Sequence, residues 1–287
     1  RDGNKLSSIV ERKVESILLD EKKYLKILNK TFKTGKAKRL DDASGRYSEF
    51  LKSTLSKKIS QKKLKIVLDC ANGATYNIAP NLFWELGHSI IKINDKPNGI
   101  NINQKCGAID TRSLSKNVLA HKADIGFAFD GDGDRLIVVD EKGKQVDGDK
   151  IIALFCKHFV KSKKSKKYDV IITVMSNMGL ENFLKNKLKL KIKRTSVGDI
   201  NVINEMKKYK SILGGEQSGH IIFSNYSNTG DGILAALKIT EIINSSEVKV
   251  SKLFNLYKEY SQKKINLTYK IKNTGLIKIV ENINKNK

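Results

Sequence analysis

The sequence predicts an α/β fold in which two α/β units follow one another along the chain. Short apolar, β-prone runs alternate with helical patterns, and turns rich in glycine and asparagine separate them. Alternation at this spacing is typical of open sheets that carry helices on their faces. The length of 287 residues leaves room for about two domains with buried cores.

The first part of the chain has a helical pattern. Ile9, Val14 and Leu18 recur at roughly helical spacing, so residues 1–40 are predicted to be mainly helical. A break containing glycine and aspartate follows, and a second helix is predicted over residues 43–55.

Strands and helices then alternate through the first predicted α/β unit. Apolar runs predict its strands at 64–69, 89–93, 125–129 and 136–139. Helical periodicity predicts the helices between them at 75–86 and 111–121.

The second predicted unit repeats this order. Asp147-Gly-Asp149 leads a helix that runs to about residue 160, and an aspartate there offsets the positive end of the helix dipole. The predicted strands are 170–174, 190–193 and 221–223, and the remaining predicted helices are 179–187, 199–208 and 232–243.

Charge and cysteine content limit the function classes. The formal net charge is +25, but only seven of the 55 basic residues are arginine, the side chain that forms bidentate contacts with bases and phosphates. The lysine-rich run at 161–167 is most simply a solvated loop, so no nucleic-acid partner is predicted. No apolar run is long enough to span a membrane. Cys70, Cys106 and Cys156 are far apart and fit free thiols in a reducing cytoplasm.

A loop with three alternating aspartates follows the predicted strand 125–129. Asp130, Asp132 and Asp134 are separated by single glycines, which can take positive φ and let the loop fold back, and Arg135 comes next. Three converging carboxylates repel one another unless a cation compensates them. Hard oxygen ligands on a short loop suit Mg²⁺, which keeps positions open for phosphate oxygens. The loop therefore predicts a metal site for phosphate chemistry.

Two simpler interpretations compete for the same loop. The aspartates fall at positions 1, 3 and 5 of an EF-hand, but position 6 is Arg135 instead of glycine and an apolar strand follows. An ordinary hairpin turn needs only one Asp-Gly pair, whereas this loop has two in tandem and a third aspartate.

A second glycine-rich loop, Gly215-Glu-Gln-Ser-Gly-His220, carries polar side chains at alternate positions. At a strand end, alternation would point Glu216, Ser218 and His220 the same way. Together a carboxylate, a hydroxyl and an imidazole offer donors and acceptors suited to sugar hydroxyls. The simpler alternative is that His220 is a packed structural histidine and Glu216 a helix-end charge.

These two loops, in this order and about 80 residues apart, resemble the α-D-phosphohexomutase family. The resemblance covers nearly the whole chain, and within the family Gln217 and Met175-Ser-Asn177 are most similar to the branch that acts on amino sugars. Five further strings agree with the family: Asp69-Cys-Ala-Asn-Gly-Ala74, Asp147-Gly-Asp149, Val174-Met-Ser-Asn177, Val197-Gly-Asp199 and Thr229-Gly-Asp-Gly232.

The resemblance implies four domains around a central cleft, and an isomerase that interconverts hexose 6-phosphates and hexose 1-phosphates with a phosphoserine and Mg²⁺. It implies that Asp130, Asp132 and Asp134 ligate Mg²⁺, and that Arg135 helps hold the transferring phosphoryl group. Metal and arginine would neutralise the phosphoryl oxygens, which is the main requirement of phosphoryl transfer.

The resemblance also implies that Glu216, Ser218 and His220 bind sugar hydroxyls in either orientation of the hexose. For the amino-sugar branch the partners would be a hexosamine phosphate and its bisphosphate intermediate, with no nucleic acid and no membrane, and a homodimer is compatible with it. The alternatives are the branch that acts on mannose and glucose phosphates, and a non-catalytic sugar-phosphate-binding fragment.

The chain departs from the family in several strings. It contains neither the Thr-Ala-Ser-His-Asn-Pro-like string of the nucleophilic serine nor the Arg-x-Ser-Gly-Thr-like phosphate loop, and many relatives carry Lys and Arg where Ser196 and Ile200 stand. We therefore expect an internal fragment without mutase turnover of its own. Its expected parts are the end of domain 1 (1–45), domain 2 with the metal loop (46–144), domain 3 with the sugar loop (145–261), and the linker and start of domain 4 (262–287).

Overall fold

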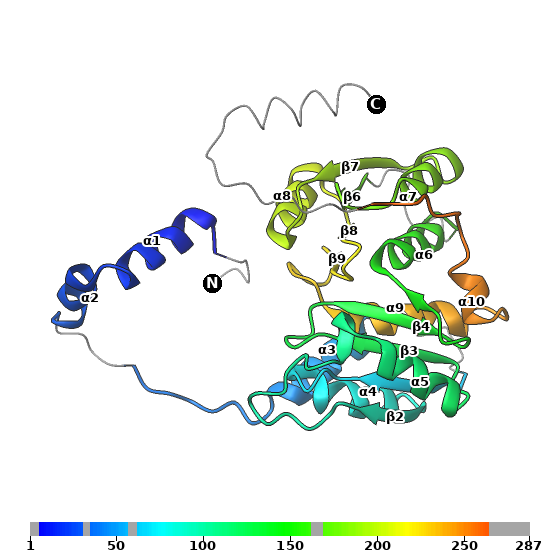
Figure 1. Cartoon of the computed structure of the whole chain (residues 1–287), viewed down its shortest axis with the longest axis horizontal. Helices are drawn as coiled ribbons and strands as arrows, with labels where there is room; N and C mark the ends of the chain where they lie inside the picture. The colour runs from blue at the N-terminus through cyan, green and yellow to red at the C-terminus, as the bar shows by residue number, and fades with distance from the viewer. Residues whose placement is uncertain (1–5, 31–34, 57–61, 162–168, 264–287) are drawn as a thin grey trace.

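Two α/β units lie one on the other in the structure (Figure 1). The computed structural model describes residues 6–30, 35–56, 62–161 and 169–263. Most of the lysine-rich run and the predicted start of domain 4 therefore lie outside the described residues. The predicted tandem α/β architecture is confirmed.

The first unit is built on a five-stranded sheet of order β2-β1-β3-β4-β5. Strands β1, β2 and β3 are parallel, whereas β4 runs antiparallel to both β3 and β5. The strands are β1 (Lys65–Asp69), β2 (Ser89–Ile93), β3 (Ile125–Phe129), β4 (Leu136–Asp140) and β5 (Gln145–Val146). The helices are α3 (Ala43–Ser53), α4 (Ile78–Glu85) and α5 (Arg112–Ala120), with short 3₁₀ turns at Ala74–Tyr76 and Gly107–Ile109.

The second unit has a four-stranded sheet of order β7-β6-β8-β9. Strands β7, β6 and β8 are parallel, and β9 is antiparallel to β8. The strands are β6 (Asp169–Thr173), β7 (Lys191–Thr195), β8 (Leu213–Gly215) and β9 (Ile221–Phe223). The helices are α6 (Gly148–Lys161), α7 (Met178–Asn182), α8 (Asp199–Tyr209), α9 (Gly232–Asn244) and α10 (Val250–Leu253).

The two sheets share one topology. In each unit the first strand lies between the second and the third, and a fourth strand returns antiparallel to the third. The aspartate loop connects β3 to β4, and the second glycine-rich loop, residues 215–220, connects β8 to β9 and is called the sugar loop after its predicted role. The two candidate loops therefore occupy corresponding hairpins of the two units.

A continuous apolar core joins the two units. It contains Phe127 of the first sheet, Ile172 of the second sheet and Leu237 of α9. Helix α9 follows the second sheet in sequence but packs against β3 and β4 of the first. Its N-cap Asp231 accepts a hydrogen bond from the Tyr47 hydroxyl of α3 at 2.8 Å. This crossing helix fixes the two units to each other.

Separate apolar clusters cover the other faces. Leu114 and Val118 of α5 pack on Val67 of the first sheet. Val202 and Met206 of α8 pack on the second sheet. Helices therefore cover both faces of each sheet, as the alternating pattern predicts.

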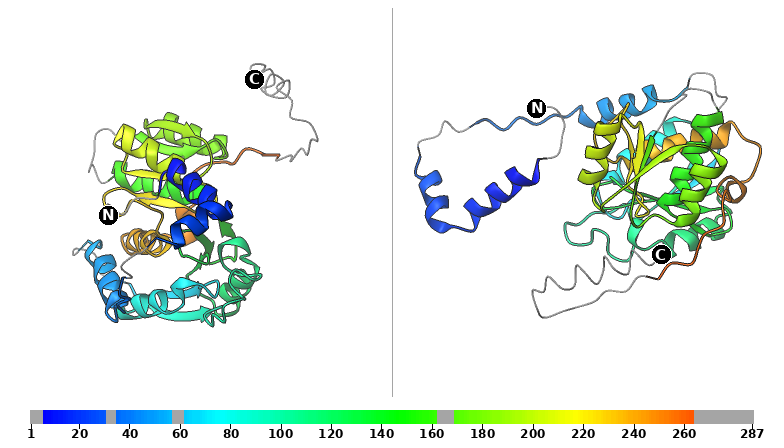
Figure 2. Two further views of the ribbon diagram at one scale, coloured as in Figure 1. Left: turned by 90° about the vertical axis from the view of Figure 1, so that its left-hand side faces the viewer. Right: turned by 90° about the horizontal axis from the view of Figure 1, so that it is seen from above.

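Helices α1 (Ser8–Leu18) and α2 (Glu21–Leu28) lie apart from the two units, as Figure 1 and the right-hand view of Figure 2 show. Ser7 and Asp20 cap their N-termini. The helical prediction for residues 1–40 is confirmed over these two ranges, while residues 35–40 form no helix. Among the described residues, no helix has both the length and the apolarity that a membrane crossing requires.

Two predicted helices differ in detail from the structure. The helix predicted at 75–86 begins as a 3₁₀ turn and becomes α-helical only at Ile78. The helix predicted at 179–187 continues beyond α7 as a π turn over Phe183–Lys187. Strand β5 and helix α10 were not predicted, because two to four residues give too little periodicity to recognise.

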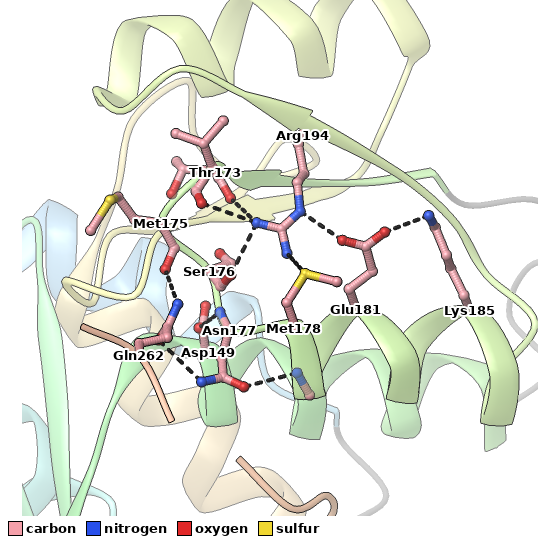
Figure 3. A network of polar contacts seen from close by, with 12 residues as sticks. Asp149, Thr173, Met175, Ser176, Asn177, Met178, Glu181, Lys185, Arg194 and Gln262 are labelled. Carbon is pink, nitrogen blue, oxygen red and sulfur yellow. Dashed lines mark hydrogen bonds and ion pairs between the residues drawn. The ribbon is translucent and has the colours of Figure 1, made fainter. Parts of the chain in front are cut away.

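Arg194 of β7 holds the segment that follows β6 (Figure 3). Its Nη1 atom donates to the carbonyl oxygens of Thr173, Val174 and Ser176 at 3.0–3.2 Å. Its Nε atom donates to Glu181 at the start of α7 at 2.7 Å. One guanidinium thus donates hydrogen bonds to three backbone carbonyl groups and also pairs with a largely buried carboxylate.

Asp149 of α6 supports the same segment from the other side (Figure 3). It is fully buried, and its Oδ2 atom accepts the Asn177 backbone N–H at 2.6 Å. The Asn177 side chain in turn donates to the Tyr260 carbonyl and accepts the Tyr260 N–H, at 2.9 and 3.0 Å. Burial raises the pKa of Asp149 to about 6. Asp149 therefore links the N-terminal turn of α6 to the segment after β6, in addition to offsetting the positive end of the helix dipole.

Arg194→Ala should lower the free energy of unfolding by about 1–3 kcal/mol, because Glu181 and three carbonyl groups lose their partner. Urea unfolding followed by circular dichroism measures this change. Lys191→Ala on the same strand, at an exposed position, is the matched control and should change stability by less than about 0.5 kcal/mol. Equal effects of the two substitutions would contradict the role given to Arg194.

Asp149→Asn should change how stability depends on pH. The ordinary pKa of 3.8 is raised to about 6 in the folded chain, so between these pH values the folded chain binds more protons than the unfolded chain. The contribution of Asp149 therefore destabilises the fold as pH rises through this window. Asn can accept the same N–H without carrying a charge. The free energy of unfolding of the variant, relative to that of the unaltered chain, should therefore rise by on the order of 2 kcal/mol from pH 4 to pH 7. Urea unfolding at both pH values tests this; a constant difference would contradict it.

Candidate active site

The aspartate loop folds back on itself between β3 and β4. The Gly133 N–H donates to the Asp130 carbonyl oxygen at 3.1 Å, and Gly133 has φ +77°, as expected for a glycine at this bend. Each of Asp130, Asp132 and Asp134 offers a carboxylate oxygen, and these atoms lie within 4.8 Å of one another. The structure thus brings together the three carboxylates that the sequence predicts.

The environments of the three carboxylates differ. Asp130 is buried, Asp134 is half-buried and Asp132 is exposed. Burial, together with the neighbouring carboxylates, raises the pKa of Asp130. Burial also acts to raise the pKa of Asp134, but the hydrogen bond and charge of His220, a hydrogen bond with Asp130 and the charge of Arg135 together outweigh it and leave that pKa below its usual value. The loop is therefore a concentration of negative charge whose inner member is poorly solvated.

Arg135 lies beside this charge. Its backbone N–H donates to Asp130 Oδ1 at 3.1 Å, and its Nε atom is 3.4 Å from Asp130 Oδ2 and 4.0 Å from Asp134 Oδ1. The side chain is 40% exposed although its Nε atom is buried, so part of it can meet a ligand from solvent. This placement suits an arginine that meets a phosphoryl group next to a metal.

The donor set of the aspartate loop fits Mg²⁺. All three side chains offer hard carboxylate oxygens, and Asp134 Oδ1 is buried without a hydrogen-bond partner among the described residues. A buried carboxylate oxygen without a partner is costly, and a bound cation would remove that cost.

The sugar loop is a turn and not an extended strand end. Strand β8 ends at Gly215, and the Gly219 N–H donates to the Glu216 carbonyl oxygen at 3.0 Å. Glu216 and His220 are both buried and approach each other to 3.3 Å, whereas Ser218 is exposed at the tip of the turn. The expected alternation of all three side chains is therefore wrong, because the backbone turns over Gln217 and Ser218 instead of continuing the pleat.

The two loops are joined directly. His220 Nε2 lies 2.6 Å from Asp134 Oδ2, so an imidazole of the sugar loop contacts a carboxylate of the aspartate loop. The backbones pair as well, because the Leu136 N–H donates to the Gly219 carbonyl oxygen at 3.0 Å and Arg135 forms an antiparallel bridge with His220. A Cβ atom at position 219 would clash with the Leu136 backbone, so this approach requires glycine.

His220 is the centre of this junction. Burial acts to lower its pKa, but hydrogen bonds to Asp134 and Glu216 outweigh burial and raise the pKa to about 9. The imidazole is therefore a cation at neutral pH, held between two carboxylates. His220 is a packed histidine, as the simpler interpretation holds, and it is packed between the two candidate loops.

Two residues that were not predicted from the sequence also belong to the site. Asp199, at the start of α8, offers an oxygen within 4.8 Å of ligand atoms on Asp134 and His220. The Gly198 N–H donates to Glu216 Oε1 at 3.0 Å. Gly198 and Asp199 both lie in the Val-Gly-Asp string after β7. The sequence signal that could have identified them is the position of this string at the carboxyl end of a strand, where open α/β sheets bind ligands.

Two profile matches cover most of the chain. Residues 45–143 match the phosphoglucomutase/phosphomannomutase α/β/α domain II, and residues 147–260 match domain III of the same family. The matched regions contain the aspartate loop and the sugar loop, respectively.

Individual relatives agree with this assignment. The chain is 46% identical over 265 residues to a phosphoglucosamine mutase of Nautilia profundicola, covering 92% of this chain and 59% of the relative. It is 48% identical over 261 residues to a phosphoglucosamine mutase of Thermodesulfovibrio yellowstonii, covering 91% of this chain and 57% of the relative. The chain thus spans less than two thirds of the length of these relatives.

A solved structure has the same fold. A phosphoglucomutase/phosphomannomutase family protein of Burkholderia thailandensis matches 82% of this chain and 51% of its own, with a TM-score of 0.69 and 25% sequence identity. Two family domains in tandem, each carrying one of the paired loops, lead to one conclusion: the chain belongs to the phosphoglucomutase/phosphomannomutase family, the α-D-phosphohexomutases.

Proposed function

We propose that this chain supplies the metal-binding and sugar-binding domains of a phosphoglucosamine mutase. Such an enzyme interconverts glucosamine 6-phosphate and glucosamine 1-phosphate, through a bisphosphate intermediate, on the route to UDP-N-acetylglucosamine. The observation that carries the proposal is the direct contact between the aspartate loop and the sugar loop through Asp134 and His220. The names of the similar full-length proteins favour the amino-sugar branch.

Each loop has a separate role in this proposal. Asp130, Asp132 and Asp134 would hold Mg²⁺, which would supply positive charge to the oxygens of a transferring phosphoryl group. Arg135 adds a second cation on the open side of the loop. The nucleophilic phosphoserine would come from a string that these 287 residues do not contain.

The sugar loop would fix the hexose beside that charge. Ser218 is exposed at the tip of the turn and can exchange hydrogen bonds with either face of a sugar. Glu216 and His220 hold each other and the aspartate loop, so they would set the position of the turn as well as offer polar edges to the ligand. Positioning of this kind is a major part of phosphoryl-transfer catalysis.

The remaining assignments belong to the same proposal. Residues 1–45 would be the end of domain 1, and residues 262–287 the linker and the start of domain 4. A cytoplasmic location is supported by Cys70, Cys106 and Cys156, which are buried free thiols. A homodimer stays a prediction.

Asp132→Asn should weaken Mg²⁺ binding by about tenfold or more, because one of three anionic donors is lost. The fold should stay intact, since Asp132 is exposed and its removal relieves like-charge repulsion. Isothermal titration with Mg²⁺, beside a thermal unfolding curve, measures both effects. Unchanged affinity in a folded variant would overturn the ligand assignment.

Ser218→Ala should weaken binding of glucosamine 6-phosphate several-fold without changing stability, because the hydroxyl is exposed at the turn. Ser16→Ala on the separate helix α1 is the matched control and should leave affinity unchanged.

Titrating the unaltered chain with glucosamine, mannose and glucose phosphates tests the branch. Tighter binding of mannose 1-phosphate than of glucosamine 1-phosphate would overturn the amino-sugar assignment.

A further inference from the structure

Asp69, the last residue of β1, joins two segments that both contact the aspartate loop. It is fully buried, and each of its carboxylate oxygens accepts a backbone N–H. Oδ1 accepts from Ala71 at 3.0 Å, and Oδ2 accepts from Gly107 at 2.9 Å. The first bond shapes the turn that follows β1, and the second holds the end of the long connection 94–107. Bonds of this kind to an ionised carboxylate are stronger than those between neutral groups.

The turn and the connection are also bonded to each other. The Asn72 N–H donates to the Asn94 carbonyl oxygen at 2.6 Å, and the Asn103 N–H donates to the Ala71 carbonyl oxygen at 2.9 Å. Ala71 and Asn72 both have left-handed backbone, with φ +53° and +48°. Such conformations are unfavourable for alanine and persist only where surrounding bonds determine them. Asp69 supplies one of these bonds at Ala71.

The turn after β1 and the connection 94–107 both contact the aspartate loop at Gly131, the residue between Asp130 and Asp132. The Ala74 N–H of the turn donates to the Gly131 carbonyl oxygen at 2.8 Å. Ile102 of the connection covers the Gly131 Cα atom so closely that a Cβ there would lie 2.5 Å from Ile102 Cδ1. The turn therefore holds the peptide of Gly131 and the connection holds its Cα atom.

The aspartate loop needs such support because its own charges oppose its shape. One oxygen of each carboxylate lies within 4.8 Å of the others, so the three carboxylates repel, and the cationic His220 and Arg135 beside them compensate this repulsion only in part. Hydrogen bonds inside the loop, such as the one from Gly133 to Asp130, do not remove this repulsion. Contacts from outside the loop must then keep the carboxylates together before a metal binds.

We propose that Asp69 is a positioning residue for the aspartate loop: by binding Ala71 and Gly107 together, it holds Gly131 in place and preorganises the three carboxylates for a divalent cation. This inference rests on the proposed Mg²⁺ site. It gives the Asp69-Cys-Ala-Asn-Gly-Ala74 string a role in metal affinity.

The test compares Asp69→Asn with the unaltered chain in two measurements. An asparagine can accept only one of the two N–H groups, and its amide N–H₂ would face the other. Mn²⁺, used as a paramagnetic substitute for Mg²⁺, should bind about 10- to 100-fold more weakly, as measured by electron paramagnetic resonance. Without metal, hydrogen exchange of the peptide containing Gly131 and Gly133 should be at least about tenfold faster.

Asp124→Asn is the matched control. Asp124 Oδ2 accepts the Lys65 N–H at 2.7 Å, so it makes the same kind of bond at the opposite end of β1. This substitution should leave Mn²⁺ affinity and loop exchange unchanged, even where it lowers the unfolding temperature. A loss of affinity equal to that of Asp69→Asn would mean that general destabilisation is responsible, and would overturn the inference.

Ile102→Ala covers the case in which Asp69→Asn does not fold. Ile102 is 52% exposed, so its truncation should keep the fold while it loosens the contact on Gly131. Mn²⁺ affinity should fall, by less than in Asp69→Asn. Unchanged affinity and unchanged exchange in the folded variants would overturn the inference. If the unaltered chain binds no Mn²⁺, the proposed metal site fails, and the exchange measurement still decides whether Asp69 holds the loop.

Discussion

The contact between His220 and Asp134 is the interaction on which the arrangement of the site depends. It links a protonated imidazole of the second unit to a carboxylate of the first over 2.6 Å, and Glu216 holds the other side of the ring. The pairing partly compensates a loop whose remaining carboxylates repel one another. Backbone bonds from Leu136 to Gly219 and from Gly232 to Gly133 fix the same junction without charge. The aspartate loop and the sugar loop are thus joined through both side chains and backbone.

The common topology of the two sheets explains why these loops can meet. Each loop is the connection between the third and fourth strands of its sheet, where the chain turns from parallel to antiparallel pairing. Stacking the units through a shared core, with α9 crossing onto the first sheet, places one hairpin against the other. Neither hairpin has its functional environment alone, because each supplies neighbours to the other. A site between two domains is a common place for ligand binding.

Buried carboxylates organise the edges around this junction in different ways. Asp69 and Asp149 are both fully buried; Asp69 accepts the backbone N–H groups of Ala71 and Gly107, and Asp149 accepts that of Asn177. Burial raises the pKa of both, which means that their charge is retained at a cost in solvation. The hydrogen bonds that these carboxylates accept offset part of that cost, and they also fix the shape of the bonded segments. Short Asp-Gly and Asp-Cys-Ala-Asn strings in the sequence mark these places.

The sequence by itself determined the tandem α/β order, most strands to within a residue, and the two loops, because apolar periodicity and glycine-bounded acidic strings are local properties. It also carried the resemblance that the family matches support. It did not determine that Glu216 begins a turn, that His220 faces Asp134, or that Asp199 and Asp69 support the site. Those facts depend on which strands become neighbours and on how one sheet lies on the other. Residues far apart in the chain meet only through that packing, so only the tertiary structure decided them.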